Sequence, residues 1–230
     1  MSWRKRQRDC KLNFSVLNRK TKYLQVALNS SLTDAQQIIA SLPRSERILV
    51  EAGTPLIKAF GQEAIRHLKA WWGGYVVADL KTMDRGETEA TIAKLSGADG
   101  AIALGQAPVE TLNAFILACE KVGMDAMVDM MNVDQPVKIL RKLKKLPRVV
   151  ILHRGVDEET YNKDKPIPYV QINKIRSSYD LMVSIAGGDE IREVQRAIFN
   201  DANIVVVWKG FYSAAGDTGK LAEEFLRVIK

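Results

Sequence analysis

The segment Asp79-Leu80-Lys81-Thr82-Met83-Asp84 places two carboxylates and an ammonium group close together, directly after an apolar run. If that run is a β-strand, side-chain alternation puts Asp79 and Lys81 on the same side of it. Opposite charges favour each other's ionised form, so such a pair stays charged in a desolvated pocket. Ion pairs are also common at the ends of strands, so this motif alone leaves a structural interpretation open.

Glu51 and His153 each stand at the end of a short apolar run, like Asp79. Glu51 and Asp79 could together hold Mg²⁺, which typically takes one or two protein carboxylates and leaves room for water and substrate oxygens. His153 is suited to transferring a proton at the carbon next to a carbonyl, because the ordinary pKa of an imidazole is about 6.5. Glu51 could instead cap a helix, and a lone histidine is often structural. His67 lies in a helical pattern, and we assign it no chemistry.

Glycines and a lysine follow the last two apolar runs. Gly187-Gly188 follows one of them, and Lys209-Gly210 stands just after the other. Glycine lets backbone N–H groups approach an oxyanion closely, and a following helix N-terminus adds a favourable dipole. Gly187-Gly188 could be a simple turn, but a basic residue on the next run favours a phosphate site.

The elements that must position these residues are eight short apolar, β-branched runs, each followed by a helical pattern. The runs are residues 23–28, 47–50, 75–78, 100–104, 125–130, 149–152, 181–185 and 204–207. Helix-start residues stand at Thr33-Asp34, at Pro108 and at Asp134-Gln135-Pro136. Strict alternation predicts parallel strands joined by right-handed crossovers, and eight such units predict an α/β fold of the (β/α)₈ TIM barrel type. A doubly wound open sheet is the rival, but no GxGxxG follows the first run.

A barrel of this kind carries its active site at the C-terminal ends of the strands. Acids, a lysine, a histidine and glycines collect at those positions, which is the main reason to expect an enzyme. The residues are Asn29, Glu51, Asp79, Lys81, Asp84, Gly105, Asp129, His153, Gly187, Gly188, Lys209 and Gly210.

The net charge of +7 is concentrated at the N-terminus. Residues 1–22 contain eight basic residues and one acid, and the rest of the chain has 26 of each. We therefore expect a basic N-terminal extension at 1–22 and a single catalytic barrel at 23–230. A basic arm can bind phosphate backbones, but a solvated or partner-facing tail is preferred, because the neutral body shows no basic stripe.

The sequence has no membrane-spanning run and no apolar segment typical of a secretory signal. Its two cysteines, Cys10 and Cys119, have no metal-site spacing, and Cys119 lies in an apolar run typical of a buried hydrophobe. We expect a cytoplasmic protein that does not bind membranes, and nucleic acid is the less favoured partner.

Several motifs resemble those of hexulose-6-phosphate synthases, in the suprafamily of orotidine 5'-monophosphate decarboxylase and 3-keto-L-gulonate-6-phosphate decarboxylase. The motifs stand in order and with fitting spacing from Tyr23 to the C-terminus. They are Glu51-Ala52-Gly53-Thr54-Pro55-Leu56-Ile57-Lys58, Asp79-Leu80-Lys81-Thr82-Met83-Asp84-Arg85-Gly86-Glu87, Val128-Asp129-Met130, His153-Arg154-Gly155-Val156-Asp157-Glu158-Glu159 and Ala186-Gly187-Gly188.

The resemblance implies a homodimer with two composite active sites and Mg²⁺ as cofactor. Glu51 and Asp79 would bind the metal, and Lys81 would hydrogen-bond the substrate and the intermediate. His153 would transfer the proton, and Asp84 would reach into the partner subunit's site. Lys81 could suggest a Schiff base, but between Asp79 and Asp84 it should stay protonated, and we assign it an electrostatic role.

The reaction implied is the reversible aldol condensation of formaldehyde with D-ribulose 5-phosphate, which gives D-arabino-hex-3-ulose 6-phosphate. Mg²⁺ would act as a Lewis acid on the ketose oxygens and stabilise the developing enediolate. Asp129 would bind substrate hydroxyls, and Gly187, Gly188 and Lys209 would hold the phosphate.

Three features depart from the family pattern. Asn29 stands where the family usually has aspartate, and an amide can hydrogen-bond but supplies no negative charge. Trp208 precedes Lys209-Gly210 where a glycine is usual, and residues 161–168 form a distinct loop. These changes mark either a divergent subgroup with the same activity or a different substrate.

Two decarboxylase activities and a non-catalytic role remain as alternatives. Orotidylate decarboxylases typically have Ile-Pro after the last aspartate of the third-strand motif, where this chain has Arg85-Gly86. The Lys-Thr-Met-Asp stretch and Asp129, in place of glutamate, favour the synthase over the 3-keto-L-gulonate-6-phosphate enzyme. A barrel that only binds phosphosugars or nucleic acid is the third alternative.

Overall fold

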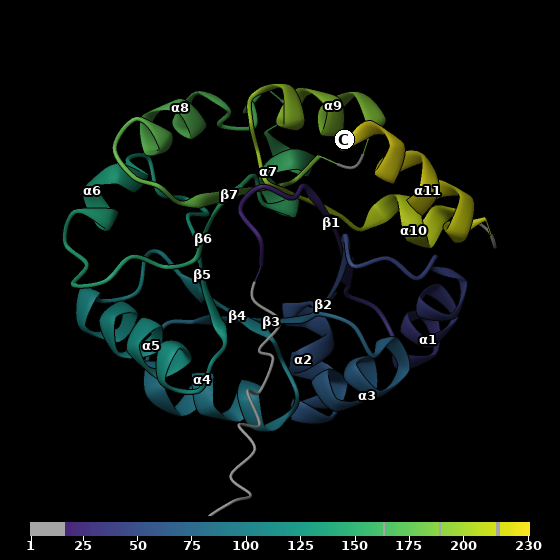
Figure 1. The fold of residues 1–230 in the computed structure, drawn as a ribbon, viewed down its shortest axis with the longest axis horizontal. Coiled ribbons are helices and arrows are strands. Elements are labelled where there is room, and N and C mark those ends of the chain that lie inside the picture. Colours follow the sequence, from purple (N-terminus) through teal and green to yellow (C-terminus); the bar gives the residue numbers. More distant parts are fainter. Residues whose placement is uncertain (1–16, 163, 189, 215–216) are drawn as a thin grey trace, which may run out of the picture.

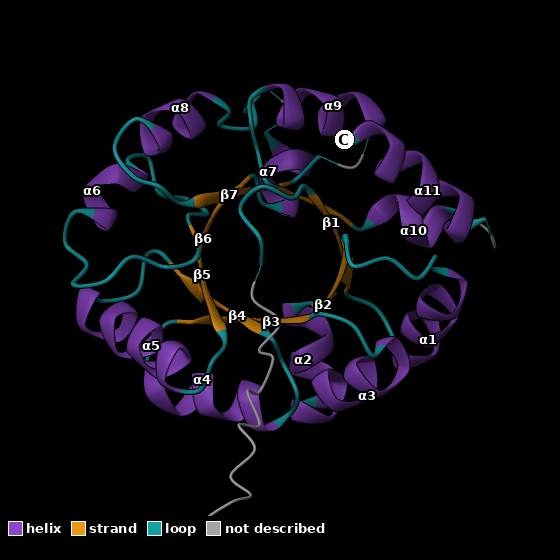
Figure 2. Ribbon diagram, in the orientation of Figure 1, coloured by secondary structure: helices purple, strands orange, loops and turns teal. Residues whose placement is uncertain are grey.

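Eight parallel strands close into a barrel in which each strand pairs with the next and β8 pairs with β1 (Figures 1 and 2). The computed structural model describes residues 17–230 apart from 163, 189 and 215–216. The strands are β1 (Tyr23–Leu28), β2 (Ile48–Ala52), β3 (Val76–Thr82), β4 (Gly100–Leu104), β5 (Asp125–Asp129), β6 (Val149–His153), β7 (Met182–Ala186) and β8 (Ile204–Val207). The predicted (β/α)₈ TIM barrel is confirmed.

Helices surround the barrel in the order that the alternating pattern predicts. They are α1 (Leu32–Ser41), α2 (Thr54–Phe60), α3 (Gln62–Trp72), α4 (Gly86–Leu95), α5 (Val109–Lys121), α6 (Pro136–Leu140), α7 (Val156–Tyr161), α8 (Val170–Arg176), α9 (Ile191–Phe199), α10 (Lys209–Ser213) and α11 (Thr218–Val228). In the described part of the chain, none is long and apolar enough to cross a membrane.

Local signals explain where several helices begin and end. The Ser31 hydroxyl accepts a hydrogen bond from the backbone N–H of Asp34 and so caps α1, while Pro108 is the N-cap of α5. The apolar spacing after Pro136 continues to Leu146, yet α6 ends at Leu140. The chain turns there, and the backbone N–H of Lys144 donates to the Asn113 side chain at 2.8 Å.

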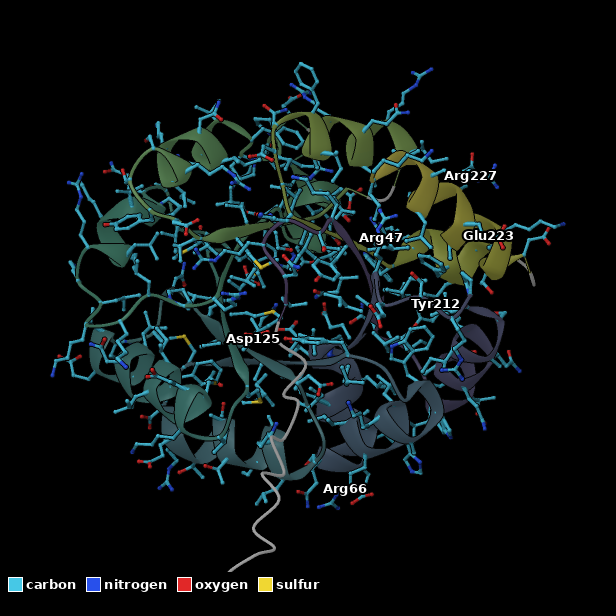
Figure 3. The ribbon with its side chains drawn as sticks, in the orientation of Figure 1. Arg47, Arg66, Asp125, Tyr212, Glu223 and Arg227 are labelled. Atoms are coloured by element: carbon cyan, nitrogen blue, oxygen red, sulfur yellow. The ribbon has the colours of Figure 1, made fainter. Side chains whose placement is uncertain are left out.

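The core has two layers because each strand is buried on both faces. One layer lies between the strands and the helices, and the other fills the barrel interior. Leu49, Val77, Met127 and Met182 belong to the interior layer and close the barrel below the site. Arg66 and Arg227 point outward from the surrounding helices (Figure 3).

Residues 17–22, directly before β1, run across the opening at the N-terminal ends of the strands (Figure 1). Leu17 is only 2% exposed, and its backbone N–H donates to the carboxylate of Asp125 at 3.0 Å. The hydroxyl of Tyr75 donates to the same carboxylate oxygen at 2.8 Å. Burial raises the pKa of Asp125. Leu17 of the expected extension therefore packs into the floor of the barrel, and residues 1–16 lie outside the described residues.

Candidate active site

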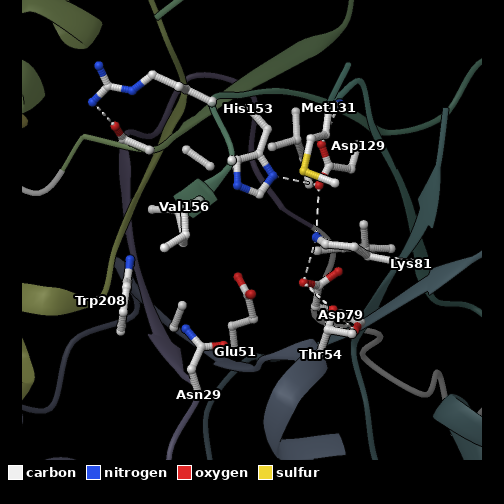
Figure 4. Close-up of a pocket in the computed structure, with 18 of the residues that line it drawn as sticks. Asn29, Glu51, Thr54, Asp79, Lys81, Asp129, Met131, His153, Val156 and Trp208 are labelled. Atoms are coloured by element: carbon white, nitrogen blue, oxygen red, sulfur yellow. Dashed lines mark hydrogen bonds and ion pairs between the residues drawn. The ribbon is translucent and has the colours of Figure 1, made fainter. Parts of the chain in front are cut away.

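A cavity of about 390 Å³ opens at the C-terminal ends of the strands. All eight strands, or the loops that directly follow them, contribute to its wall, as expected of this fold. Ionisable side chains line it in two places, around Lys81 and around Arg154, and apolar side chains such as Ile102, Ile151 and Val206 cover much of the rest. The group around Lys81 carries most of the charges (Figure 4).

A row of four charged or ionisable side chains crosses this cavity (Figure 4). The Lys81 ammonium donates to Asp79 at 2.9 Å and to Asp129 at 3.0 Å. The same oxygen of Asp129 lies 2.7 Å from Nδ1 of His153. When the ring is neutral and its Nδ1–H donates to Asp129, the lone pair is on Nε2. Nε2 faces the cavity.

The charges of this row shift each other's pKa values. Burial by itself would lower the pKa of Lys81, but Asp79 and Asp129 outweigh it and raise this pKa. Burial by itself would raise the pKa of Asp129, but His153 and Lys81 lower it to about 2. The pKa of His153 is raised, because Asp129 overcomes the effect of burial on the ring. Lys81 therefore stays protonated, as predicted, although its second carboxylate partner is Asp129 and not Asp84. The pKa of His153 lies above its ordinary range.

Lys81 reaches this position through an irregular backbone. The register between β3 and β4 shifts between Ala78 and Thr82, and Lys81 has a φ of 46°. A left-handed conformation in a residue with a side chain costs of order 1 kcal/mol and is frequent at functional sites. Asp79 and Lys81 do face the same cavity, as predicted, but a bulge at the end of β3 places them there.

Glu51 and Asp79 share the cavity and offer oxygen atoms for a divalent cation. The Oδ1 atom of Asp79 is buried without a hydrogen-bond partner among the described residues, while its Oδ2 accepts from Thr54 and Lys81. Gln25 donates from its amide to Glu51, and its own Oε1 is buried and likewise has no partner in the described part of the chain. These are hard oxygen donors, the type that Mg²⁺ prefers.

Burial, together with the charge of Asp79, raises the pKa of Glu51 to about 7. A cation between the two acids would relieve that repulsion and hold both as carboxylates. Within the described residues there is no cluster of three or more His, Cys, Asp or Glu side chains suited to a metal. Two carboxylates suffice for Mg²⁺ when water and substrate oxygens complete its shell, so the predicted pair fits this metal.

The end of the cavity next to β7 and β8 differs from the prediction. Gly187 lines it with a φ of 96°, and a Cβ there would lie 2.3 Å from the carbonyl oxygen of Arg154. Trp208 also lines it. Gly188, Lys209 and Gly210 do not line the cavity. The ammonium of Lys209 instead lies 2.5 Å from the carboxylate of Glu159, a residue of α7 that does line it.

Asn29 lies in the cavity, whereas Asp84 lies outside it. Asn29 follows β1, and its side chain covers Gly53, where a Cβ would lie 1.8 Å from Asn29 Oδ1. Asp84 is exposed in the loop between β3 and α4. Within one subunit the structure therefore brings together Asn29, Glu51, Asp79, Lys81, Asp129, His153 and Gly187. It leaves Asp84 at the surface.

Sequence reasoning missed three residues of the site, Gln25, Arg154 and Glu159. Gln25 had a visible signal, because it is the only strongly polar residue in the first apolar run. It is 1% exposed and contacts Glu51. Arg154 and Glu159 had no such signal, since the orientation of a side chain after β6 or on α7 depends on the folded loop.

Comparisons with known proteins agree with this geometry. A family model described as "Orotidine 5'-phosphate decarboxylase / HUMPS family" matches residues 22–225. The bifunctional enzyme Fae/Hps of Methanocaldococcus jannaschii is 35% identical over 208 residues, which cover 90% of this chain and 52% of that protein. The Fae/Hps enzyme of Archaeoglobus fulgidus is 36% identical over 213 residues, 90% of this chain and 53% of that protein. The chain thus spans about half the length of these relatives.

Solved structures show the same likeness. The 3-hexulose-6-phosphate synthase from Salmonella typhimurium superposes with a TM-score of 0.80 at 25% identity, over 90% of this chain and 98% of that one. Another 3-hexulose-6-phosphate synthase gives a TM-score of 0.78 at 29% identity, over 90% and 100%. The KGPDC from Streptococcus mutans, at 22% identity and a TM-score of 0.73, shares the fold, over 91% and 100%.

Proposed function

Because the chain belongs to the orotidine 5'-phosphate decarboxylase / HUMPS family, we propose that it interconverts D-arabino-hex-3-ulose 6-phosphate with D-ribulose 5-phosphate and formaldehyde. The observation that carries this proposal is the row His153–Asp129–Lys81–Asp79 in the same cavity as Glu51. The names of the Fae/Hps relatives and of the synthase structures support the same substrate.

In the synthetic direction, His153 removes a proton from C1 of D-ribulose 5-phosphate. Its Nε2 faces the cavity, while Asp129 holds Nδ1 and stabilises the imidazolium that forms. The electron pair left on C1 delocalises into the C2 carbonyl as an enediolate, and C1 then attacks formaldehyde. The proton taken by His153 has to return to the oxygen of the former formaldehyde for the cycle to close.

Lys81 and the two acids supply the electrostatic part of the reaction. The ammonium of Lys81 is fixed by Asp79 and Asp129, so it can donate a hydrogen bond to the developing enediolate without reorganising. Glu51 and Asp79 would hold Mg²⁺, which when bound polarises the carbonyl oxygen of the ketose. Gln25 orients Glu51 from below.

We further propose a homodimer that forms around the loop between β3 and α4. Asp84 and the apolar side chain of Met83 are exposed in this loop, and Ile92 and Leu95 are exposed on α4 itself, Leu95 at 76%. A second copy covering this surface would bury those side chains and bring Asp84 to a neighbouring site. A cytoplasmic location accords with Cys119, a buried unpaired thiol.

Formaldehyde release from purified D-arabino-hex-3-ulose 6-phosphate tests the proposed activity. We expect release with Mg²⁺, loss of release with a chelator, and a rate lower by about a hundredfold or more in Lys81→Ala. Lys145→Ala is the matched control, because Lys145 forms an exposed ion pair with Glu120 away from the cavity.

Absence of release, or equal rates in Lys81→Ala and the wild type, would refute the proposal. Faster CO₂ release from 3-keto-L-gulonate 6-phosphate than formaldehyde release from the hexulose would reassign the chain to the decarboxylases. Sedimentation of an active monomer would contradict the dimer.

A further inference from the structure

Four charged side chains form a cluster next to β7 and β8, and two of them, Arg154 and Glu159, line the cavity there. Arg154 lies 3.8 Å from Glu159 and 3.6 Å from Glu193, measured between guanidinium nitrogen and carboxylate oxygen. Lys209 forms the shortest of these pairs, with Glu159 at 2.5 Å. Two cations thus meet on the single carboxylate of Glu159. Glu159 and Arg154 both line the cavity.

The cluster is built into the fold. Arg154 is 12% exposed at its side chain, and it also donates to the backbone oxygen of Gly187 at 2.7 Å. Its Nε is buried without a hydrogen-bond partner in the described structure. The guanidinium is therefore fixed beside Gly187, where the backbone has no side chain and a ligand oxygen can approach closely.

The charges of these four side chains cancel each other. Arg154 and Lys209 carry two positive charges, and Glu159 and Glu193 carry two negative ones. A phosphate monoester, close to a dianion at neutral pH, would gain no net attraction from the cluster as it stands. If the side chain of Glu159 moves out of the cluster, the remaining three side chains have a net positive charge. Arg154 and Lys209 then lose the carboxylate that they share.

We propose that Glu159 is an internal anion that competes with the phosphate group of the substrate for Arg154 and Lys209. Binding of the phosphate breaks the Lys209–Glu159 pair and moves the side chain of Glu159 away from the cavity wall. Glu159 thus sets the affinity for the phosphate end of the ligand without taking part in the chemistry at C1. This inference rests on the proposed sugar-phosphate substrate.

Inorganic phosphate is the probe, because it reports on this end of the cavity without turnover. Calorimetric titration of Glu159→Gln should give a dissociation constant about fivefold lower than that of the wild type, as expected for the loss of competing, partly exposed ion pairs. Asp157→Asn is the matched control: it removes one negative charge from an exposed position of the same helix and should change the constant by less than about twofold.

A second variant makes the test independent of the first. Lys209→Met should weaken phosphate binding more in the Glu159→Gln background than in the wild type, because Glu159 already engages Lys209 in the wild type. Glu159→Ala replaces Glu159→Gln if the latter does not fold by circular dichroism.

Three results would overturn the proposal: equal or weaker phosphate binding after loss of the Glu159 charge, equal effects of Lys209→Met in both backgrounds, or no phosphate binding in any of these proteins. Formaldehyde release by the same wild-type preparation reports on the proposed function separately. An active enzyme whose phosphate affinity ignores Glu159 would refute only this inference.

Discussion

Replacement of Lys81 by methionine is expected to destabilise the barrel by about 3 kcal/mol at neutral pH. Methionine fills a similar volume but leaves Asp79 and Asp129 with no ammonium between them. Their side chains are 8% and 2% exposed, so water cannot readily take the place of the lost partner. Removal of one member of a buried ion pair typically costs 3–5 kcal/mol (roughly), and the 21% exposure of Lys81 favours the lower end of that range.

The pH dependence of the free energy of unfolding tests the same interaction between Lys81 and Asp129. The pKa of Asp129 is about 2 in the folded protein, below its ordinary value of 3.8. This carboxylate therefore contributes about 2 kcal/mol of stability above pH 4 or so, which is lost as the pH falls through about 2. In Lys81→Met one of its two cationic neighbours is gone, so its folded pKa rises and the acid-dependent part of the stability shrinks.

Urea denaturation at several pH values measures both effects, with Lys145→Met as the control. Lys145 forms a pair of 2.5 Å with Glu120, but both side chains are more than half exposed, so the same substitution should cost less than about 1 kcal/mol. A cost below about 1 kcal/mol for Lys81→Met, or the same loss in both variants, would refute the view that buried carboxylates depend on Lys81.

Three further predictions concern the rest of the site. Asp129→Asn should lower the pKa of His153, because the carboxylate raises it in the wild type; NMR titration measures this with the other histidine as internal reference, and an unchanged or higher pKa would contradict the assigned pair. Gln25→Leu should weaken Mn²⁺ binding, used as a probe for Mg²⁺, by about tenfold through loss of the contact that orients Glu51; paramagnetic resonance would show an unaltered affinity if that contact has no role. Gly187→Ala should raise KM for the sugar phosphate more than it lowers kcat, since φ is 96° and the added methyl group would lie 2.3 Å from a backbone carbonyl oxygen; a wild-type KM would argue against a phosphate site there.

Most of the fold could be predicted because the barrel depends on a regular pattern. Each strand is buried on both faces, so its apolar run is continuous and easy to find, and β1, β4 and β8 have the predicted bounds. The end of β3 was less regular. The strand continues through Lys81 to Thr82, because a bulge, which alternation does not reveal, extends it past the apolar residues.

The end of the cavity around Lys81 was predictable from position alone, whereas the end next to β7 and β8 was not. Asp129 and His153 are the last residues of β5 and β6, and Asp79 directly follows the apolar part of β3, so the strands fix the direction of these side chains. Lys209 stands one residue beyond Trp208, where the backbone leaves the strand and begins α10. Its side chain turns to Glu159, a partner 50 positions earlier in the chain that no local pattern could have indicated.

The floor of the barrel has a practical consequence for anyone who redesigns this chain. Leu17 covers the interior before β1 begins, and the carboxylate of Asp125 accepts the hydrogen bond from its backbone N–H. A fusion junction placed at Tyr23 would remove that cover and admit water beneath Tyr75. Any domain fused ahead of this barrel should therefore be joined upstream of Leu17, so that Leu17 stays attached to the strands that it covers.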